Sequence, residues 1–376
     1  MILGCVNVIA DEMNPARVAA LRLGMGEAMT AFTVQINCGS GMQSIDTAYR
    51  YIREGAADLI LAGGADSLSH APLVFSRNAV NWYARLFAAR GIGARLSAFL
   101  GFRPSFLTPV IGLERGLTDP ITELNMGQTA ELVAHLFHVT RRQADEYAAE
   151  SQLRLATAQK NNYFAGEIVP AFARDGTLFD HDDGVRPDSN ADALAKLRPA
   201  FERPWGKVTP GNSSQITDGA SWVILASEEA LLAHKLTPKA VIVDSEWSAL
   251  DPSVMGLGPC YCSTAILKRH QLALNDIELW ELNEAFAAQV LGCLAAWEDD
   301  EFCRDALRLP GAAGKIPRDR LNIDGGAIGV GHPVGASGNR IVLHLVNAMR
   351  RLGYKRGIAT ECIGGGQGGA MLIQMM

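Results

Sequence analysis

The sequence lacks the segments and the charge balance that mark membrane, secreted and nucleic-acid-binding proteins. Its longest apolar stretch, Ala285–Trp297, is shorter than the roughly 20 residues that a helix needs to cross a bilayer. The opening segment, MILGCVNVIADEMNP, has neither a basic region nor a long apolar one, so we expect no signal peptide. Acidic residues outnumber basic ones by 40 to 34, and the net charge of −6 indicates no basic stripe for nucleic acid. We therefore expect no membrane span and no nucleic-acid partner.

Cysteine is sparse, with seven residues in a chain of 376. An odd, scattered set favours a reduced compartment over a disulfide framework, so we expect a cytoplasmic protein. Cys260 and Cys262 form a C-x-C pair, but no second pair stands at zinc-ligand spacing, and we expect no metal. The chain also lacks a G-x-S-x-G motif and a complete phosphate-binding P-loop, which argues against a serine hydrolase and a P-loop nucleotide enzyme.

Apolar residues, at 48%, and glycine, with 38 residues, are what the chain has in quantity. The glycines cluster at the ends of apolar runs, which is typical of α/β proteins whose chain turns from strand to helix around a site. The length favours two to three domains. Apolar periodicity predicts helices at 40–54, 129–161, 340–351 and from 284 onward, and strands at 31–37, 59–62, 222–226, 240–244, 277–282 and 358–360.

The two ends of the chain carry a faint internal repeat. C-G-S-G at 38–41 opens a predicted helix, and the strand that follows ends in a glycine pair at 63–64. G-A-S-G at 335–338 opens another helix, and its strand ends in three glycines at 364–366. We interpret this as a duplicated half. The acidic segment 297–320 interrupts the second copy and is expected to be a solvated excursion.

Cys38 is the first candidate for chemistry, because it stands between a predicted strand and a predicted helix. A thiol at a helix N-terminus feels the positive end of the helix dipole, which favours the thiolate and predicts a lowered pKa. Gly39 and Gly41 permit a sharp turn and close approach of a substrate. The alternative is a small buried residue, as most free cysteines are.

Three further segments contain candidate polar groups. His332 lies in the glycine-rich loop 325–338, next to a proline and before a helix, where an imidazole can serve as a base; a surface histidine is the alternative. Cys362 leads into consecutive glycines whose N–H groups can face a developing oxyanion. Asn283 ends a predicted strand, and it either caps the next helix or holds a water or a carbonyl oxygen.

Together these segments resemble the thiolase family in their order and wide separation. The resemblance rests on N-C-G-S-G-M at 37–42, N-E-A-F-A at 283–287, G-G-A-I-G-V-G-H-P-V-G-A-S-G at 325–338 and C-I-G-G-G-Q-G at 362–368. Supporting stretches at 59–69, 125–131, 211–220 and 255–259 extend it over essentially the whole chain. The segment N-M-G-Q-T-A-E and the acidic excursion look most like the bacterial fatty-acid-degradation thiolases.

The resemblance implies an α/β fold of two duplicated halves. Each half would hold a mixed five-stranded sheet, and the halves would stack in five αβαβα layers. The first half is expected at 1–70 and 213–238, an inserted loop domain that binds CoA and substrate at 71–212, and the second half at 239–376. Family members normally begin with another strand and helix, so we expect the first sheet to lack a central strand.

The resemblance also implies an acyltransferase mechanism. The Cys38 thiolate, with its proton taken by His332, would attack a 3-ketoacyl-CoA, so that acetyl-CoA leaves and free CoA then releases the acyl group. The reverse is a Claisen condensation of acetyl-CoA. Cys362 matches the family's second cysteine, the acid/base that moves a proton on the acetyl α-carbon. One oxyanion site would use His332 with a water held by Asn283, and the other the N–H groups of Cys38 and Gly364.

By the same resemblance, Ser214 lies near the pantetheine arm of CoA and Met126 lines the acyl pocket. CoA is then substrate and product, and no other cofactor is expected. The family's usual homodimer or homotetramer is expected, and a fatty-acid oxidation partner subunit stays open.

Three alternatives remain at the level of sequence. Ketoacyl synthases pair the nucleophilic cysteine with two histidines, and hydroxymethylglutaryl-CoA synthases use a glutamate, so Cys362 favours a thiolase over both. An inactive, thiolase-like acyl-CoA or lipid carrier is the third; the absent first strand favours it, whereas the full set of polar groups argues against it. Cys260 and Cys262 replace the small non-thiol residues usual in the family and are expected to be packing residues.

Overall fold

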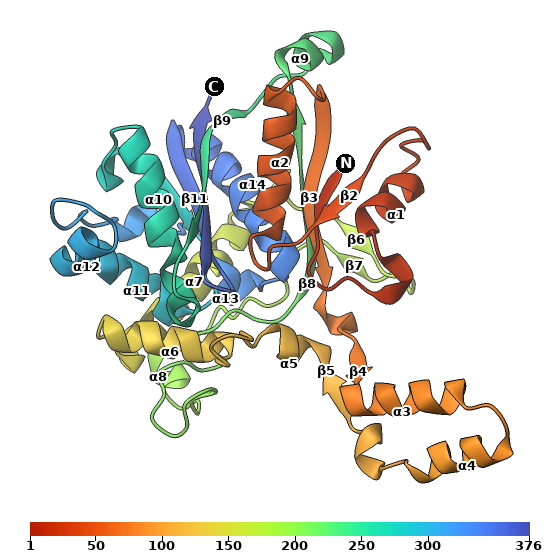
Figure 1. Cartoon of the computed structure of the whole chain (residues 1–376). Helices are drawn as coiled ribbons and strands as arrows, with labels where there is room; N and C mark the ends of the chain where they lie inside the picture. Colours follow the sequence, from red (N-terminus) through yellow and green to blue (C-terminus); the bar gives the residue numbers. More distant parts are fainter.

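The computed structural model describes all 376 residues as two four-stranded sheets with helices between and outside them (Figure 1). The first sheet has the order β2-β1-β3-β8, in which β1 runs parallel to β2 and β3, and β8 runs antiparallel to β3. Its strands are β1 (Ile2–Gly4), β2 (Phe32–Val34), β3 (Leu59–Ser67) and β8 (Asp218–Ala226). This ladder is continuous, so the expected gap in the middle of the sheet was wrong.

The second sheet repeats this plan, with the order β10-β11-β12-β9. Its strands are β9 (Ala240–Ala249), β10 (Leu279–Leu282), β11 (Arg356–Ile363) and β12 (Gln367–Met375). The two sheets align strand by strand: β1 corresponds to β10, β3 to β11 and β8 to β12. In the second sheet β9 lies at the edge, next to β12. Its counterpart in the first sheet would therefore lie at the edge next to β8, not in the middle. The prediction of five strands per sheet was also wrong here, because the fifth position shrinks to a single parallel bridge between Leu321 and Trp280.

Two helices fill the layer between the sheets: α2 (Ser40–Arg53) and α14 (Val334–Leu352). Their apolar faces pack against both sheets at once. The shared core contains Met42, Ile45, Ile341, Leu345 and Met349 from the helices, and Ile2, Ile60, Leu279, Ala359 and Met371 from the strands. Burial of one such side chain contributes roughly 1.5–3 kcal/mol, so this layer holds the two halves together.

The N-terminal turns of α2 and α14 meet at backbone distance. A Cβ on Gly41 would lie 2.7 Å from the Asn339 nitrogen, and a Cβ on Gly338 would lie 2.7 Å from the Met42 nitrogen. These two glycines hold the fourth positions of C-G-S-G and G-A-S-G, so the internal repeat corresponds to two related helices that touch each other. Asp66, at the end of β3, accepts hydrogen bonds from the Val6, Asn7 and Gly335 N–H groups and so ties the first sheet to the start of α14.

The outer layers differ in how much of each sheet the helices cover. The first sheet is flanked by α1 (Pro15–Arg22), and the second is covered by α10 (Gly258–Arg269) and α11 (Ala287–Glu298) over a core that contains Trp280 and Trp297. Cys260 and Cys262 are fully buried in this core, which confirms them as packing residues. The remaining helices after β8 are α9 (Glu228–His234), which still belongs to the first half, and α12 (Asp300–Asp305) and α13 (Ala327–Val330) of the second.

The acidic segment 297–320 is less solvated than its composition suggested. Cys303 on α12 is fully buried, and Leu307 and Ile316 also enter the core. The charged residues instead serve the fold, since Asp299 caps α12 through the Phe302 N–H at 2.7 Å. The expectation of a solvated excursion therefore holds for the exposed acidic residues at 298–301 but not for the apolar residues of the segment, which join the core.

The region between β3 and β8 contains mostly helices. Its elements are β4 (Leu73–Phe75), α3 (Arg77–Ala88), α4 (Ile92–Leu100), β5 (Pro109–Ile111), α5 (Gly112–Gly116), α6 (Met126–Leu136), α7 (Arg141–Lys160), β6 (Ala171–Phe172), β7 (Leu178–Phe179) and α8 (Ala191–Leu194). The single helix predicted at 129–161 is two helices, because Thr140 begins a new one with a capping box to Gln143. None of the helices in the chain combines the length and apolar character that a membrane span requires.

The contact between the two central helices predicts a stability difference. We expect Gly41→Ala to lower the free energy of unfolding by about 1–3 kcal/mol, because a methyl group there meets backbone atoms that cannot rotate away. Gly93→Ala in α4 is the matched control, since nothing lies within 4 Å of its Cβ position. Urea denaturation of both variants measures this; equal midpoints would contradict the packing argument.

Candidate active site

Cys38 lies in a tight turn between β2 and α2. Asn37 adopts a left-handed conformation with φ of 46°, which reverses the chain just before the cysteine. The Ser40 hydroxyl accepts a hydrogen bond from the Ile36 N–H at 2.8 Å and donates one to the Asn37 carbonyl at 2.7 Å. The turn is therefore held by its own polar groups, and Cys38 stands partly buried two residues before the helix.

The predicted lowering of the Cys38 pKa was wrong. Burial, and then the negative charge of the nearby Glu361 carboxyl, raise the pKa of Cys38 to about 12, although the Gly364 and Cys38 N–H groups act in the opposite direction. Desolvation thus exceeds the contribution of the helix terminus. The side chain of Cys38 is therefore a thiol at neutral pH, and a nucleophilic role would need a base.

The second half supplies one backbone donor to the same sulfur, and the first half supplies the other. The Gly364 N–H and the Cys38 N–H both interact with the Cys38 thiol. The Asn37 side chain donates to the Gly364 carbonyl at 2.7 Å, which fixes one loop against the other. These are the two N–H groups that sequence reasoning assigned to one oxyanion site, and the structure brings them to Cys38 from different halves.

Cys362 lies near the end of β11 and is buried in a small apolar cluster with Met255 and Ala285. Met126, the first residue of α6, packs against this cluster, and its sulfur would lie 3.2 Å from a Cβ on Gly364. Burial, and then the nearby Cys38 charge, raise the pKa of Cys362 well above its usual range. The structure therefore brings Cys38, Cys362, Gly364 and Met126 together.

His332 has the geometry of a neutral base. Burial, and then the positive charge of Arg340, lower its pKa to about 4, so the imidazole is uncharged at neutral pH. Its Nδ1 lies 2.6 Å from the Ser337 hydroxyl, which in turn donates to the Pro333 carbonyl at 3.3 Å. That chain assigns the proton to Nδ1 and the lone pair to Nε2, which has no hydrogen-bond partner in the structure.

Asn283 is buried, and neither atom of its side-chain amide has a partner. It does not cap a helix, since α11 begins at Ala287 after Phe286, so the capping alternative was wrong. An unpaired buried amide is costly, and a water or a substrate oxygen would satisfy it. The Asn283 N–H donates to the Thr360 carbonyl at 2.9 Å, which places the residue beside β11.

One loop joins the Asn283 segment to the His332 loop. The Ser214 N–H donates to the Ala285 carbonyl at 3.0 Å, and the Gln215 carbonyl accepts from the His332 N–H at 2.9 Å. Ser214 is partly exposed, at the boundary of this arrangement. It is thus near the polar groups in the fold, and its contact with CoA stays a prediction.

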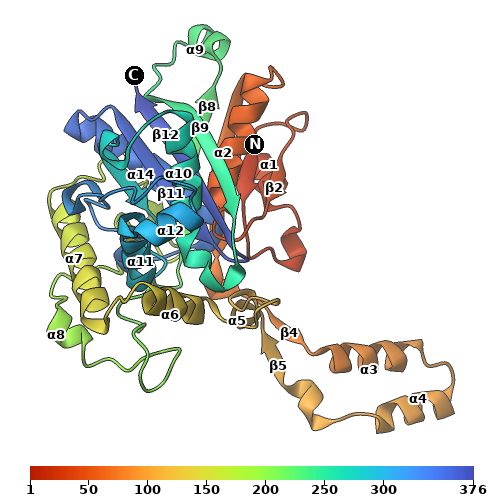
Figure 2. The ribbon, with the colours of Figure 1, turned by 60° about the vertical axis from the view of Figure 1, so that its left-hand side comes forward.

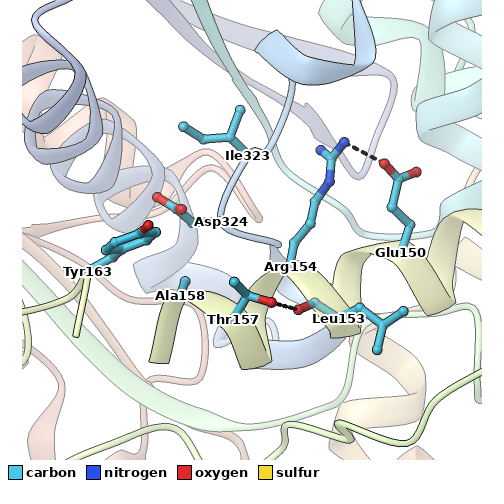
Figure 3. Close-up of a pocket in the computed structure, with 8 residues that line it drawn as sticks. All are labelled: Glu150, Leu153, Arg154, Thr157, Ala158, Tyr163, Ile323 and Asp324. Atoms are coloured by element: carbon cyan, nitrogen blue, oxygen red, sulfur yellow. Dashed lines mark hydrogen bonds and ion pairs between the residues drawn. The ribbon is translucent and has the colours of Figure 1, made fainter. Parts of the chain in front are cut away.

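A separate hollow lies along α7, and none of these residues lines it (Figure 3). It has a volume of about 230 Å³, and its charged groups are occupied. Arg154 pairs with Glu150, and Asp324 pairs with His344 at 3.2 Å and with Arg351. These pairs indicate a structural role for the hollow, not a reaction site.

Sequence reasoning missed three residues that shape the site. Ser337 orients His332, Asn37 joins the two loops, and Glu361 is a buried carboxyl whose pKa is raised well above its usual range by burial. Ser337 and Asn37 stood inside the quoted motifs, so their positions were visible and their roles were not. Glu361 had no signal beyond its place next to Cys362.

A buried thiol, a neutral imidazole and backbone donors at the junction of two related α/β halves are the groups that an acyl-transferring enzyme uses. Family models for "Thiolase, N-terminal domain" and "Thiolase, C-terminal domain" match residues 1–229 and 236–375. The chain belongs to the thiolase family and is an acyltransferase.

Relatives agree over the full chain. The beta-ketoadipyl-CoA thiolase of Pseudomonas aeruginosa is 38% identical, over 100% of this chain and 86% of the relative. The mitochondrial trifunctional enzyme subunit beta of Bos taurus is 35% identical, over 100% of this chain and 78% of the relative. The crystal structure of human mitochondrial 3-ketoacyl-CoA thiolase in complex with CoA matches with a TM-score of 0.83 and 35% identity, covering 100% of this chain and 86% of that one.

The two pKa values predict a flat pH profile for the first chemical step. With the pKa of His332 near 4 and that of Cys38 near 12, the thiol and the neutral imidazole coexist across the neutral range. We expect the single-turnover acylation rate to change less than about threefold between pH 6 and pH 9 and to fall as the pH approaches 4, where the imidazole gains a proton. Stopped-flow or quenched-flow acylation measures this. A rise with a midpoint near 9, the ordinary thiol value, would show that a free thiolate attacks instead.

Proposed function

We propose that this protein cleaves 3-ketoacyl-CoA with CoA, through an acyl-enzyme on Cys38, and catalyses the reverse condensation of acetyl-CoA. The observation that carries the proposal is the meeting of Cys38, Cys362 and the Gly364 N–H beside one another, with a neutral histidine base in the same half as Cys362. The matched relatives are named as thiolases and acetyl-CoA acyltransferases, which supports the same chemistry.

In the first step, His332 Nε2 takes the thiol proton as the Cys38 sulfur attacks the C3 carbonyl carbon of the 3-ketoacyl-CoA. The S–C3 bond forms and the C2–C3 bond breaks, so the electron pair passes to the acetyl-CoA enolate. Cys362 donates its proton to C2, and acetyl-CoA leaves. The raised pKa of Cys362 suits this role, because the residue holds its proton until the carbanion develops.

In the second step, the thiol of free CoA attacks the acyl-enzyme carbonyl. Its proton passes to the Cys362 thiolate, and the sulfur of Cys38 leaves and regains the proton held by His332. All protons then return to their starting places, so the cycle is balanced without another cofactor. CoA serves as substrate and product.

Two sets of donors would stabilise the negative charge that develops on oxygen. The Cys38 and Gly364 N–H groups suit the oxygen on C3 of the tetrahedral intermediate, because both already interact with the attacking sulfur. His332 and a water held by the unpaired Asn283 amide suit the thioester enolate oxygen. One such donor is typically worth ~2.7–4 kcal/mol of barrier.

Several finer features belong to the same proposal. Met126, which packs on the Cys362 cluster, would line the acyl pocket, and Ser214 would contact the pantetheine arm. A homodimer or homotetramer in the cytoplasm follows from the family resemblance. Because one relative is a trifunctional enzyme subunit beta, a fatty-acid oxidation partner subunit is a further candidate. Nothing in the structure favours a non-catalytic carrier.

Intact-protein mass spectrometry tests the nucleophile. After incubation with acetyl-CoA or a 3-ketoacyl-CoA, we expect one acyl group on the protein, mapped to the peptide that contains Cys38. Cys38→Ala should lose the adduct, whereas Cys303→Ala, a buried cysteine on α12, should keep it. An adduct on folded Cys38→Ala would remove that residue from its role.

Cys362→Ala separates the two steps. The variant should still accept an acetyl group from acetyl-CoA, because that transfer needs no proton on carbon. Cleavage of a 3-ketoacyl-CoA should fall by about 10²–10⁴-fold, the usual value of a general acid/base. Coupled absorbance assays measure the cleavage, and labelling measures the transfer. Normal cleavage would reject the assignment of Cys362.

A further inference from the structure

Residues 73–111 form an arm that projects from the body of the protein (Figures 1 and 2). β4 and β5 pair antiparallel at its base, where the Gly112 N–H donates to the Pro72 carbonyl at 3.0 Å. The helices α3 and α4 make its outer part, and both views show them away from the two sheets and the helices between them. The arm contributes no residue to the site around Cys38.

The arm has a small core of its own. Ala79, Trp82 and Phe106 are buried in it, and the Trp82 indole N–H donates to the Ala98 carbonyl at 2.9 Å, which ties α3 to α4. The rings of Trp82 and Phe102 meet edge to face at 5.2 Å. These contacts hold the hairpin in shape without the rest of the molecule covering it.

The outer surface of the arm is strongly apolar. On α4, Ile92, Leu96, Phe99 and Leu100 recur at the spacing that places residues on one helix face, and none of them is buried. Ile92 is 88% exposed and Phe87, at the end of α3, is 82% exposed. A contiguous apolar face of this kind marks an interaction site.

The charges of the arm all have one sign. Its five charged residues are arginines, and no Asp, Glu or Lys occurs between 73 and 111, although the whole chain carries −6. All five side chains are exposed and none takes part in an ion pair. They are Arg77, Arg85, Arg90, Arg95 and Arg103.

We propose that the arm docks on the surface of an anionic lipid bilayer. The apolar face of α4 and Phe87 would enter the boundary of headgroups and acyl chains, and the arginines would pair with lipid phosphates. A helix with an apolar face and flanking basic residues lies in the membrane interface by these two attractions. A second copy of the arm is a poorer occupant, because it would set unpaired arginines against arginines.

Flotation of the full-length protein with vesicles tests the proposal. Vesicles of phosphatidylcholine alone are compared with vesicles that contain phosphatidylglycerol in phosphatidylcholine, at low and at high salt. We expect partition to the anionic vesicles at least tenfold stronger than to the neutral ones, and a clear loss at high salt because screening weakens the charge attraction. Equal partition to both, or to neither, would overturn the proposal without any variant.

Matched variants locate the binding surface. Neutralising three arginines, Arg85→Gln, Arg90→Gln and Arg95→Gln, should weaken partition about a hundredfold, since each basic residue near the surface contributes about a fivefold factor. Arg174→Gln, Arg198→Gln and Arg350→Gln remove the same charge from exposed sites elsewhere and should keep most of the binding.

The apolar face has its own pair of variants. Ile92→Ser with Phe99→Ser should abolish flotation, and Val169→Ser with Leu232→Ser, at exposed positions outside the arm, should not. Light scattering in lipid-free buffer checks the alternative occupant. A dimer that disappears with Ile92→Ser and Phe99→Ser, without any flotation of the wild type, would assign the arm to a second copy and overturn the membrane proposal.

Discussion

The close contact between the starts of α2 and α14 is the constraint on which the rest of the structure depends. The backbone of α14 approaches Gly41 of α2, and the backbone of α2 approaches Gly338 of α14, more closely than a Cβ atom would allow. The two halves therefore share a single central layer. Cys38 stands two residues before α2, and His332 stands two residues before α14. The same contact that closes the core therefore brings the starts of the two helices, with Cys38 and His332 before them, to the junction of the halves.

Burial at the junction of the two halves also explains the protonation states of Cys38 and His332. A nucleophile enclosed by both halves is desolvated, which outweighs the helix terminus and keeps Cys38 as a thiol. The same enclosure, together with Arg340, keeps His332 neutral and able to accept a proton. Burial raises the pKa of an acid and lowers that of a base, so both shifts favour the uncharged thiol and imidazole over a preformed ion pair.

The sequence predicted the parts of this arrangement that leave local signals. The glycines beside Cys38 predicted a strand-to-helix turn correctly, whereas those beside His332 join two helices and those after Cys362 join two strands. The internal repeat predicted the duplication. The raised pKa of Cys38 could not be predicted, because it comes first from burial between the two halves and then from the Glu361 carboxyl, more than three hundred residues away in the chain. The break between α6 and α7 was missed because apolar spacing continues across Thr140, whose capping role depends on one side-chain hydrogen bond.

The candidate active site and the apolar arm lie in separate parts of the fold, and their packing differs accordingly. A site formed at the junction of two halves must be rigid, since a small shift of the loop between β11 and β12 against the turn before α2 would part the Cys38 sulfur from the Gly364 N–H. The arm instead joins the rest of the protein through the two strands β4 and β5 and has its own small core around Trp82. Its outer faces therefore pack against no other part of the chain. An interaction on the surface of α3 and α4 can therefore change without disturbing the turn at Cys38. This independence allows one chain to combine an exposed apolar face with a buried reaction site.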